Sequence, residues 1–130
     1  MSFVGKQFPN IEVNAMSDLG DTFKINVLSE AVNNKKKVLL FWYPKDFTFV
    51  CPTELEDLQN IYDKFAKAGC EVFGVSCDTH FVHKAWHDHS ERIGKITYPL
   101  LADPTHALSR DFEVYIEEAG IAERGTFIVN

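Results

Sequence analysis

The sequence predicts an α/β domain in which helices flank a mixed central sheet. Two apolar runs, residues 38–42 and 71–77, have the length of buried strands and flank a segment whose apolar residues have helical spacing. A strand, a helix and a strand in this order form a parallel pair joined by a right-handed crossover. Further short strands are expected at residues 98–101, 114–116 and 125–129.

The N-terminal third predicts a small antiparallel hairpin. Residues 11–13 and 23–25 alternate between apolar and polar side chains, and a turn is expected around residues 17–21. Residues 29–32 suit a brief helical turn. The lysine run at residues 35–37 is interpreted as a solvated loop before the first core strand.

The helix after the first core strand begins at a cysteine. Its inward face consists of apolar residues three or four positions apart, namely Leu55, Leu58, Tyr62 and Phe65. Pro52 suits the first helical position and Gly69 suits the residue after the last turn. Cys51 therefore lies where backbone N–H groups are unpaired and the helix dipole favours an anion. A thiolate is stabilised at such a place, and the thiolate is the reactive form of cysteine.

Two more helices are expected along the chain. Residues 78–80 open the first, which Gly94 ends, and its inward stripe is Val82, Ala85, Trp86, His89 and Ile93. Asp103 is expected to cap the second, which Pro104 opens and which turns Ala107, Leu108 and Phe112 inward. Residues 117–120 then form a turn.

Four histidines gather in the helix after the second core strand, at positions 80, 83, 87 and 89. His83 and His87 share a helix face, and that spacing can bind a metal. Neither His-Glu-x-x-His nor a carboxylate at ligand spacing accompanies them. Surface or packing histidines are the favoured interpretation, and a metal module stays as an alternative.

Composition indicates one globular domain over residues 1–130, with 45% apolar residues and a net charge of −6. An acidic chain lacks the basic face that nucleic acid demands. No apolar run has the length of a membrane span, and the N-terminus lacks the pattern of a signal peptide. We therefore expect a cytoplasmic protein that binds neither nucleic acid nor membrane.

Three cysteines do not make a disulfide framework. Glu54 occupies the position where a Cys-x-x-Cys motif would carry its second cysteine. Cys70 lies about 25 Å from Cys51 along the expected helix, too far for a disulfide. It is interpreted as a packing residue, and pairing between chains stays as an alternative. Cys77 lies nearer the chemistry, at the carboxyl end of a strand, but a strand cysteine is most often a small core residue.

Pro44, Thr48 and Cys51 have the spacing of the peroxiredoxin signature, and the wider run over residues 46–54 resembles the typical two-cysteine branch of that family. The resemblance implies a thioredoxin-like fold with an N-terminal hairpin. It also implies a peroxidase that reduces hydrogen peroxide and alkyl hydroperoxides without a cofactor or metal. Cys51 would then attack the peroxide and become a sulfenic acid.

The same resemblance assigns the supporting residues. Thr48 would bond both the thiolate and the peroxide, and Pro44 would shield the sulfur from water. The run over residues 120–129 resembles the segment that carries the family's active-site arginine, which makes Arg124 the candidate. Glu54 would orient this arginine. An ordinary surface ion pair is the alternative for Arg124, and Arg110, in mid-helix, is interpreted as a solvated charge.

Trp86 matches a family tryptophan that packs near the active-site loop, and a core aromatic is a compatible role.

The family also implies partners. In the family, a further strand and a long helix lead to the resolving cysteine, and nothing in this sequence, which stops at Asn130, matches them. We therefore expect a C-terminally truncated domain without a resolving cysteine. Recycling would need an external thiol or a disulfide reductase, either a flavoprotein or thioredoxin. Family members form dimers and rings of dimers, and the dimer interface is expected to be compromised here. An unpaired sheet edge would lower stability.

Two alternatives use the same fold. A thiol–disulfide oxidoreductase is disfavoured by Glu54, where the second cysteine would be. A holdase-type scaffold would suppress aggregation as well after Cys51→Ser as before it.

Overall fold

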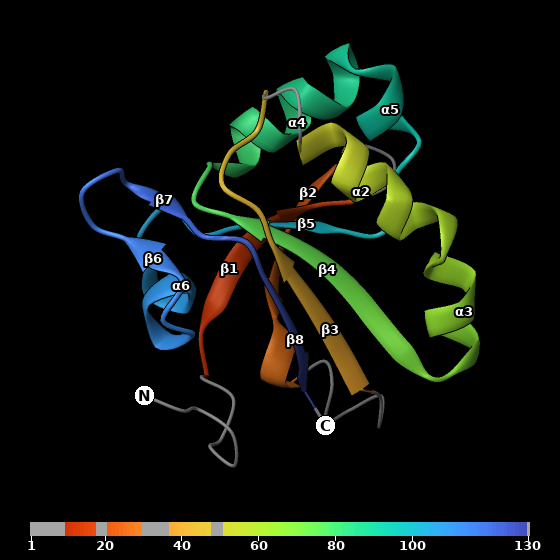
Figure 1. Cartoon of the computed structure of the whole chain (residues 1–130), viewed down its shortest axis with the longest axis horizontal. Helices are drawn as coiled ribbons and strands as arrows, with labels where there is room; N and C mark the ends of the chain where they lie inside the picture. Colours follow the sequence, from red (N-terminus) through yellow and green to blue (C-terminus); the bar gives the residue numbers. More distant parts are fainter. Residues whose placement is uncertain (1–9, 18–20, 30–36, 48–50, 130) are drawn as a thin grey trace.

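The computed structural model describes residues 10–17, 21–29, 37–47 and 51–129, and for Cys51 and Pro52 it describes the backbone alone. Within these ranges a six-stranded sheet has the order β2-β1-β5-β4-β3-β8 (Figure 1). Its strands are β1 (Glu12–Met16), β2 (Thr22–Asn26), β3 (Lys37–Trp42), β4 (Cys70–Ser76), β5 (Leu100–Ala102) and β8 (Gly125–Val129). The pairs β3–β4 and β4–β5 are parallel, whereas β1–β2, β1–β5 and β3–β8 are antiparallel. The predicted mixed sheet and N-terminal hairpin are therefore confirmed.

Helices cover both faces of this sheet. They are α2 (Cys51–Asn60), α3 (Tyr62–Lys67), α4 (His80–His89), α5 (Glu91–Gly94) and α6 (Ala107–Asp111). Leu39 of β3 packs in one buried cluster with Leu55 of α2 and Trp86 of α4. Its neighbour Leu40 packs in a second cluster with Leu108 of α6. Successive strand residues point to opposite faces, so the clusters lie on opposite sides of the sheet.

The structure corrects several predicted boundaries. The helix from Cys51 is interrupted at Ile61, and the helix from His80 is interrupted at Ser90. The third helix begins at Ala107 rather than at Pro104, because residues 104–106 form a turn in which His106 has φ 66°.

One further expectation on the second half of the chain was wrong, and one strand was not predicted. His89 is exposed, and His83 instead occupies the inner face of α4. The segment 115–122 forms a two-stranded hairpin, β6 (Tyr115–Ile116) and β7 (Ile121–Ala122), of which only the first strand was predicted.

Helix signals at single residues were accurate. Gly69 has φ 78° directly after α3 and its C-cap Ala68. The Thr79 side chain accepts a hydrogen bond from the Val82 N–H at the start of α4. In each case one residue satisfies a local requirement of the backbone: glycine adopts the left-handed conformation after a helix, and threonine caps the first helical turn.

The topology gathers the carboxyl ends of three strands at one edge of the sheet. Trp42 pairs with Val75, and Ser76 pairs with Ala102, so β3, β4 and β5 end side by side. Helices α2 and α4 begin beyond this edge (Figure 1). Functional sites of open parallel sheets are usually built at such ends.

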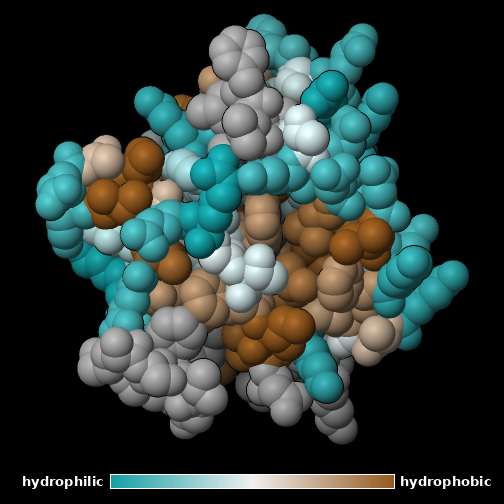
Figure 2. Space-filling model, viewed as in Figure 1, coloured by the Kyte–Doolittle hydropathy of each residue, from teal (hydrophilic) through white to brown (hydrophobic). Residues whose placement is uncertain are grey.

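Among the residues described, β8 is the strand at one edge of the sheet, next to β3. Figure 2 shows hydrophobic side chains gathered over the lower part of one face, where β3 and β8 lie in Figure 1. Ile128 of β8 is 64% exposed. In the part of the chain that the structure covers, no helix is both long enough and apolar enough to cross a membrane.

Candidate active site

The first candidate residue, Cys51, is the first residue of α2. Its backbone therefore lies at the positive end of a ten-residue helix, as predicted. Thr48 and the Cys51 sulfur lie outside what the structure describes. The residues around them define the site.

Arg124 reaches the first turn of α2 from the segment that precedes β8. Its Nε donates to Glu54 Oε1 over 2.7 Å, although the two residues are 70 positions apart. The Arg124 side chain is 47% exposed and that of Glu54 is 29% exposed. Glu54 lies one helical turn after Cys51, so the two residues are on neighbouring positions of the same helix face. The tertiary structure thus brings a guanidinium to the turn that Cys51 opens.

A second guanidinium, which sequence reasoning did not identify, also reaches this turn. Arg92 of α5 donates from Nη1 to Thr53 Oγ1 over 2.8 Å, and its Nε lies 4.0 Å from Glu56 Oε2. The side chain of Arg92 is 56% exposed. Two cations beside the start of α2 favour an anion there.

The loop from β3 to α2 is anchored by a buried cluster of three polar side chains. The Tyr43 hydroxyl donates to Asp46 Oδ1 over 2.6 Å, and Asp46 Oδ2 lies 2.6 Å from His83 Nδ1. The other ring nitrogen of His83, Nε2, lies 2.8 Å from the Leu101 carbonyl oxygen. Tyr43, Asp46 and His83 are each at most 1% exposed. These contacts connect the loop to α4 and to β5.

The Asp78 side chain holds the same loop by a hydrogen bond to the backbone of Asp46. Asp78 Oδ2 accepts from the Asp46 N–H over 2.8 Å and from the Ser76 hydroxyl over 2.8 Å. The carboxyl end of β4 therefore fixes the position of Asp46 directly.

Aromatic rings complete the packing around the loop. The Trp86 ring lies 5.9 Å from that of Tyr43 and 6.1 Å from that of Phe47, measured between centroids. Phe47 has φ 58°, which is uncommon for a residue with a bulky side chain, and it is 56% exposed. Pro44 lies between Tyr43 and Phe47 in the sequence and is half-buried.

The other two cysteines lie in inert surroundings. Burial raises the pKa of Cys70 and also that of Cys77. Cys77 Sγ lies 3.5 Å from Ser109 Oγ of α6, on the opposite face of the sheet from α2. A raised thiol pKa leaves little thiolate at neutral pH.

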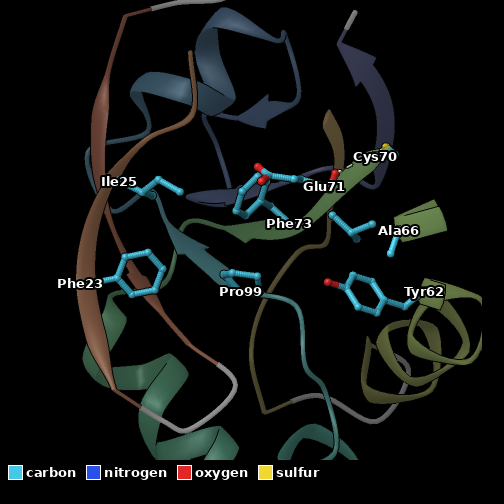
Figure 3. A pocket seen from close by; sticks show the side chains of 9 residues that line it. Phe23, Ile25, Tyr62, Ala66, Cys70, Glu71, Phe73 and Pro99 are labelled. Carbon is cyan, nitrogen blue, oxygen red and sulfur yellow. Dashed lines mark hydrogen bonds between the residues drawn. The ribbon is translucent and has the colours of Figure 1, made fainter. Parts of the chain in front are cut away.

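Cys70 lines a pocket at the start of β4, at the far end of this strand from Ser76 (Figure 3). The pocket is formed by α3, β2, β4 and Pro99, with the lining residues Phe23, Ile25, Tyr62, Ala66, Cys70, Glu71, Val72, Phe73 and Pro99. The pocket thus lies at the amino-terminal half of β4, whereas α2 begins beyond the carboxyl end of β3.

The clustered histidines of α4 were the candidates for a metal site. Among the side chains that the structure describes, no three of the types His, Cys, Asp and Glu are grouped so that they could hold an ion. His83 is buried against Asp46, and His87 Nδ1 lies 3.3 Å from Asp88 Oδ1.

Sequence reasoning missed Tyr43, Asp46 and His83 as a cluster. Tyr43 and Asp46 belong to the signature region, but nothing in their spacing shows that they pair with a histidine about 40 residues away. The one available signal was that His83 lies three positions, about one helical turn, before the inward Trp86. Arg110, by contrast, is exposed as expected and forms a pair with Glu117.

An α/β fold of this topology, with a cysteine at the start of a helix and an arginine against the first turns of that helix, is typical of thiol-dependent oxidoreductases. Residues 4–130 match the AhpC/TSA family model. Alkyl hydroperoxide reductase C of Staphylococcus aureus strain Mu50 is 50% identical over 130 residues, which are all of this chain and 68% of that protein.

Solved structures agree with this assignment. AhpC of Enterococcus faecalis superposes with a TM-score of 0.94 at 44% identity, and the match covers all of this chain and 75% of that one. Reduced 2-Cys peroxiredoxin of Plasmodium vivax gives a TM-score of 0.91 at 32% identity, with 99% and 79% of the two chains covered. The chain belongs to the AhpC/TSA family, and its fold is that of the peroxiredoxins.

Proposed function

We propose that this chain is a peroxidase that reduces hydrogen peroxide and alkyl hydroperoxides to water and alcohols, with Cys51 as its nucleophile. Membership of the family supports the peroxidase activity. The observation that carries the site assignment is the contact of Arg124 with Glu54, because it brings a cation to the helix turn that Cys51 opens.

The reaction is a nucleophilic displacement on oxygen. The Cys51 thiolate attacks one peroxide oxygen, an S–O bond forms and the O–O bond breaks. The leaving oxygen takes a proton and departs as water or an alcohol, and Cys51 becomes a sulfenic acid. The sulfur is oxidised by two electrons and the peroxide is reduced by two.

Two features of the site favour the thiolate and the charge that develops on oxygen. The start of α2 supplies unpaired N–H groups and the positive end of the dipole. Arg124 supplies a guanidinium with several donors in a fixed plane. Glu54 opposes a nearby anion by its own charge, but its contact with Arg124 orients the guanidinium.

Thr48 and Pro44 complete the proposed site. The Thr48 hydroxyl would donate to the thiolate and accept from the peroxide, as the family resemblance implies. Pro44 has no N–H and would limit access of water to the sulfur. Trp86, packed against Tyr43 and Phe47, would hold the loop that carries both.

We further propose that residues 1–130 act as one cytoplasmic thioredoxin-like domain and that an external thiol or disulfide reductase returns the sulfenic acid to the thiol. A flavoprotein and thioredoxin are both suited to this step. A homo-oligomer is the expected assembly. Without prompt reduction, the sulfenic acid would proceed to sulfinic acid.

Intact-mass measurement tests the proposal. The protein is treated with one equivalent of hydrogen peroxide in the presence of a sulfenate trap. One added label on Cys51 is expected, and Cys51→Ser should remain unlabelled and unreactive. Equal peroxide consumption by Cys51→Ser and the parent would refute the function.

A further inference from the structure

We propose that His83 is a positioning residue for Cys51: by bridging Asp46 and the Leu101 carbonyl it fixes the loop that leads into α2. The inference rests on the proposed function, because it concerns the reactivity of Cys51.

Asp46 is the point at which the loop is held. Three of its hydrogen-bonding groups are engaged: Oδ1 with the Tyr43 hydroxyl, Oδ2 with His83 Nδ1 and the backbone N–H with Asp78 Oδ2. The residue is 1% exposed and lies five positions before Cys51. A carboxylate at such depth requires partners, since an unpaired buried charge is costly.

His83 connects this carboxylate to the sheet. The Leu101 carbonyl only accepts hydrogen bonds, so Nε2 of His83 carries a hydrogen and donates over 2.8 Å. A proton then lies between Nδ1 and Asp46 Oδ2, 2.6 Å apart, whichever of the two atoms holds it. The imidazole therefore acts as a rigid bridge from β5 to the loop.

Charges around the ring favour this bridge. Burial lowers the pKa of His83, but the hydrogen bond and charge of Asp46, the Leu101 carbonyl and the charge of Asp78 together raise it above its ordinary value. Burial raises the pKa of Asp46, which His83 partly offsets. The groups that face the pair are thus Tyr43 from the end of β3, Asp78 from the end of β4 and the Leu101 carbonyl of β5.

The backbone beyond Asp46 explains why the bridge affects the site rather than stability alone. Phe47 adopts φ 58°, an unfavourable conformation that surrounding contacts must maintain. Trp86, three positions after His83 on α4, packs against the Phe47 ring. Helix α4 therefore holds the described end of the loop at both Asp46 and Phe47.

The test measures the reaction of Cys51 in His83→Asn, Asp46→Asn and the double variant. Readouts are the single-turnover rate constant with hydrogen peroxide and the pH midpoint of Cys51 alkylation. We expect each single variant to be slower by about tenfold or more. We expect the alkylation midpoint to move to higher pH, because the sulfur no longer lies at its place in the dipole field. The double variant should be no slower than the slower single variant, since the two residues act as one unit.

Two controls separate positioning from folding. Ser109→Ala removes buried hydrogen bonds to Trp42 and Asp103 on the other face of the sheet, and His89→Asn changes an exposed histidine of the same helix. Both should keep the parent's rate and midpoint. If His83→Asn and Asp46→Asn lose thermal stability as Ser109→Ala does but keep the rate and midpoint, the proposal is overturned.

A milder variant covers failure to fold. Tyr43→Phe deletes only the hydroxyl that donates to Asp46 and should slow the reaction about threefold or more. A parent-like rate in Tyr43→Phe would overturn the proposal if the other variants do not fold. A parent protein whose Cys51 does not react with peroxide would instead refute the proposed function itself.

Discussion

Removing the guanidinium of Arg124 should slow the reaction of Cys51 with peroxide far more than it destabilises the chain. The structure limits how much Arg124 contributes to the free energy of unfolding. Arg124 is 47% exposed and Glu54 is 29% exposed, so solvent screens their contact. Ion pairs of this kind contribute about 0–1 kcal/mol to the free energy of unfolding. Arg124→Ala should therefore shift the denaturation midpoint only slightly.

The kinetic term is larger because it acts in the transition state. Loss of one oriented donor to developing oxygen charge typically costs about 10²–10³ in rate, or about 3–4 kcal/mol. Arg124→Lys should fall between the parent and Arg124→Ala. Lysine keeps the charge but not the planar fork of donors through which Arg124 contacts Glu54.

Rapid-mixing measurement of Cys51 oxidation, paired with urea denaturation, checks both terms. Arg110→Ala is the matched control, because Arg110 also forms an exposed ion pair, with Glu117 at 3.2 Å, but lies on α6, which packs on the opposite face of the sheet from α2. It should leave the rate unchanged. A slowdown of Arg124→Ala by less than about threefold, or one equal to that of Arg110→Ala, would refute the role of Arg124.

Three further predictions concern the cysteines, the pH dependence and the core. Alanine at either of the other two cysteines should leave the rate with peroxide unchanged, whereas Cys51→Ser abolishes it; peroxide loss followed for each variant checks this. The Asp46 and His83 pair binds protons more tightly in the folded chain, because both pKa values are raised. Its stabilisation is therefore present in mildly acid solution and lost as the pH rises through the raised pKa of His83, and melting curves between pH 5 and pH 9 should show a decline that Asp46→Asn flattens. Tyr98→Phe removes the buried bond from the Tyr98 hydroxyl to the Leu55 carbonyl, 2.7 Å long, and should cost about 0.5–1.5 kcal/mol in urea denaturation; an unchanged midpoint would contradict it.

Local signals predicted the helix and strand positions well where one residue type satisfies one backbone requirement. Gly69 and Thr79 mark the end of α3 and the start of α4 as expected. The interruptions at Ile61 and Ser90 were not predicted, because the apolar spacing continues across both residues. The start of the third helix was misplaced for a related reason. Pro104 and Asp103 are typical of a helix start, but Asp103 instead accepts from the Leu108 and Ser109 N–H groups across a turn.

The sequence by itself determined that Cys51 opens a helix after a buried strand, because apolar period, proline position and dipole are properties of neighbouring residues. Only the tertiary structure decided which distant groups surround that helix start. Arg124 and Arg92 arrive there through strand register and helix packing, and His83 meets Asp46 because the parallel pairing of β3 with β4 brings α4, which follows β4, beside the loop after β3. Such contacts depend on how all elements pack together, and no local pattern encodes them.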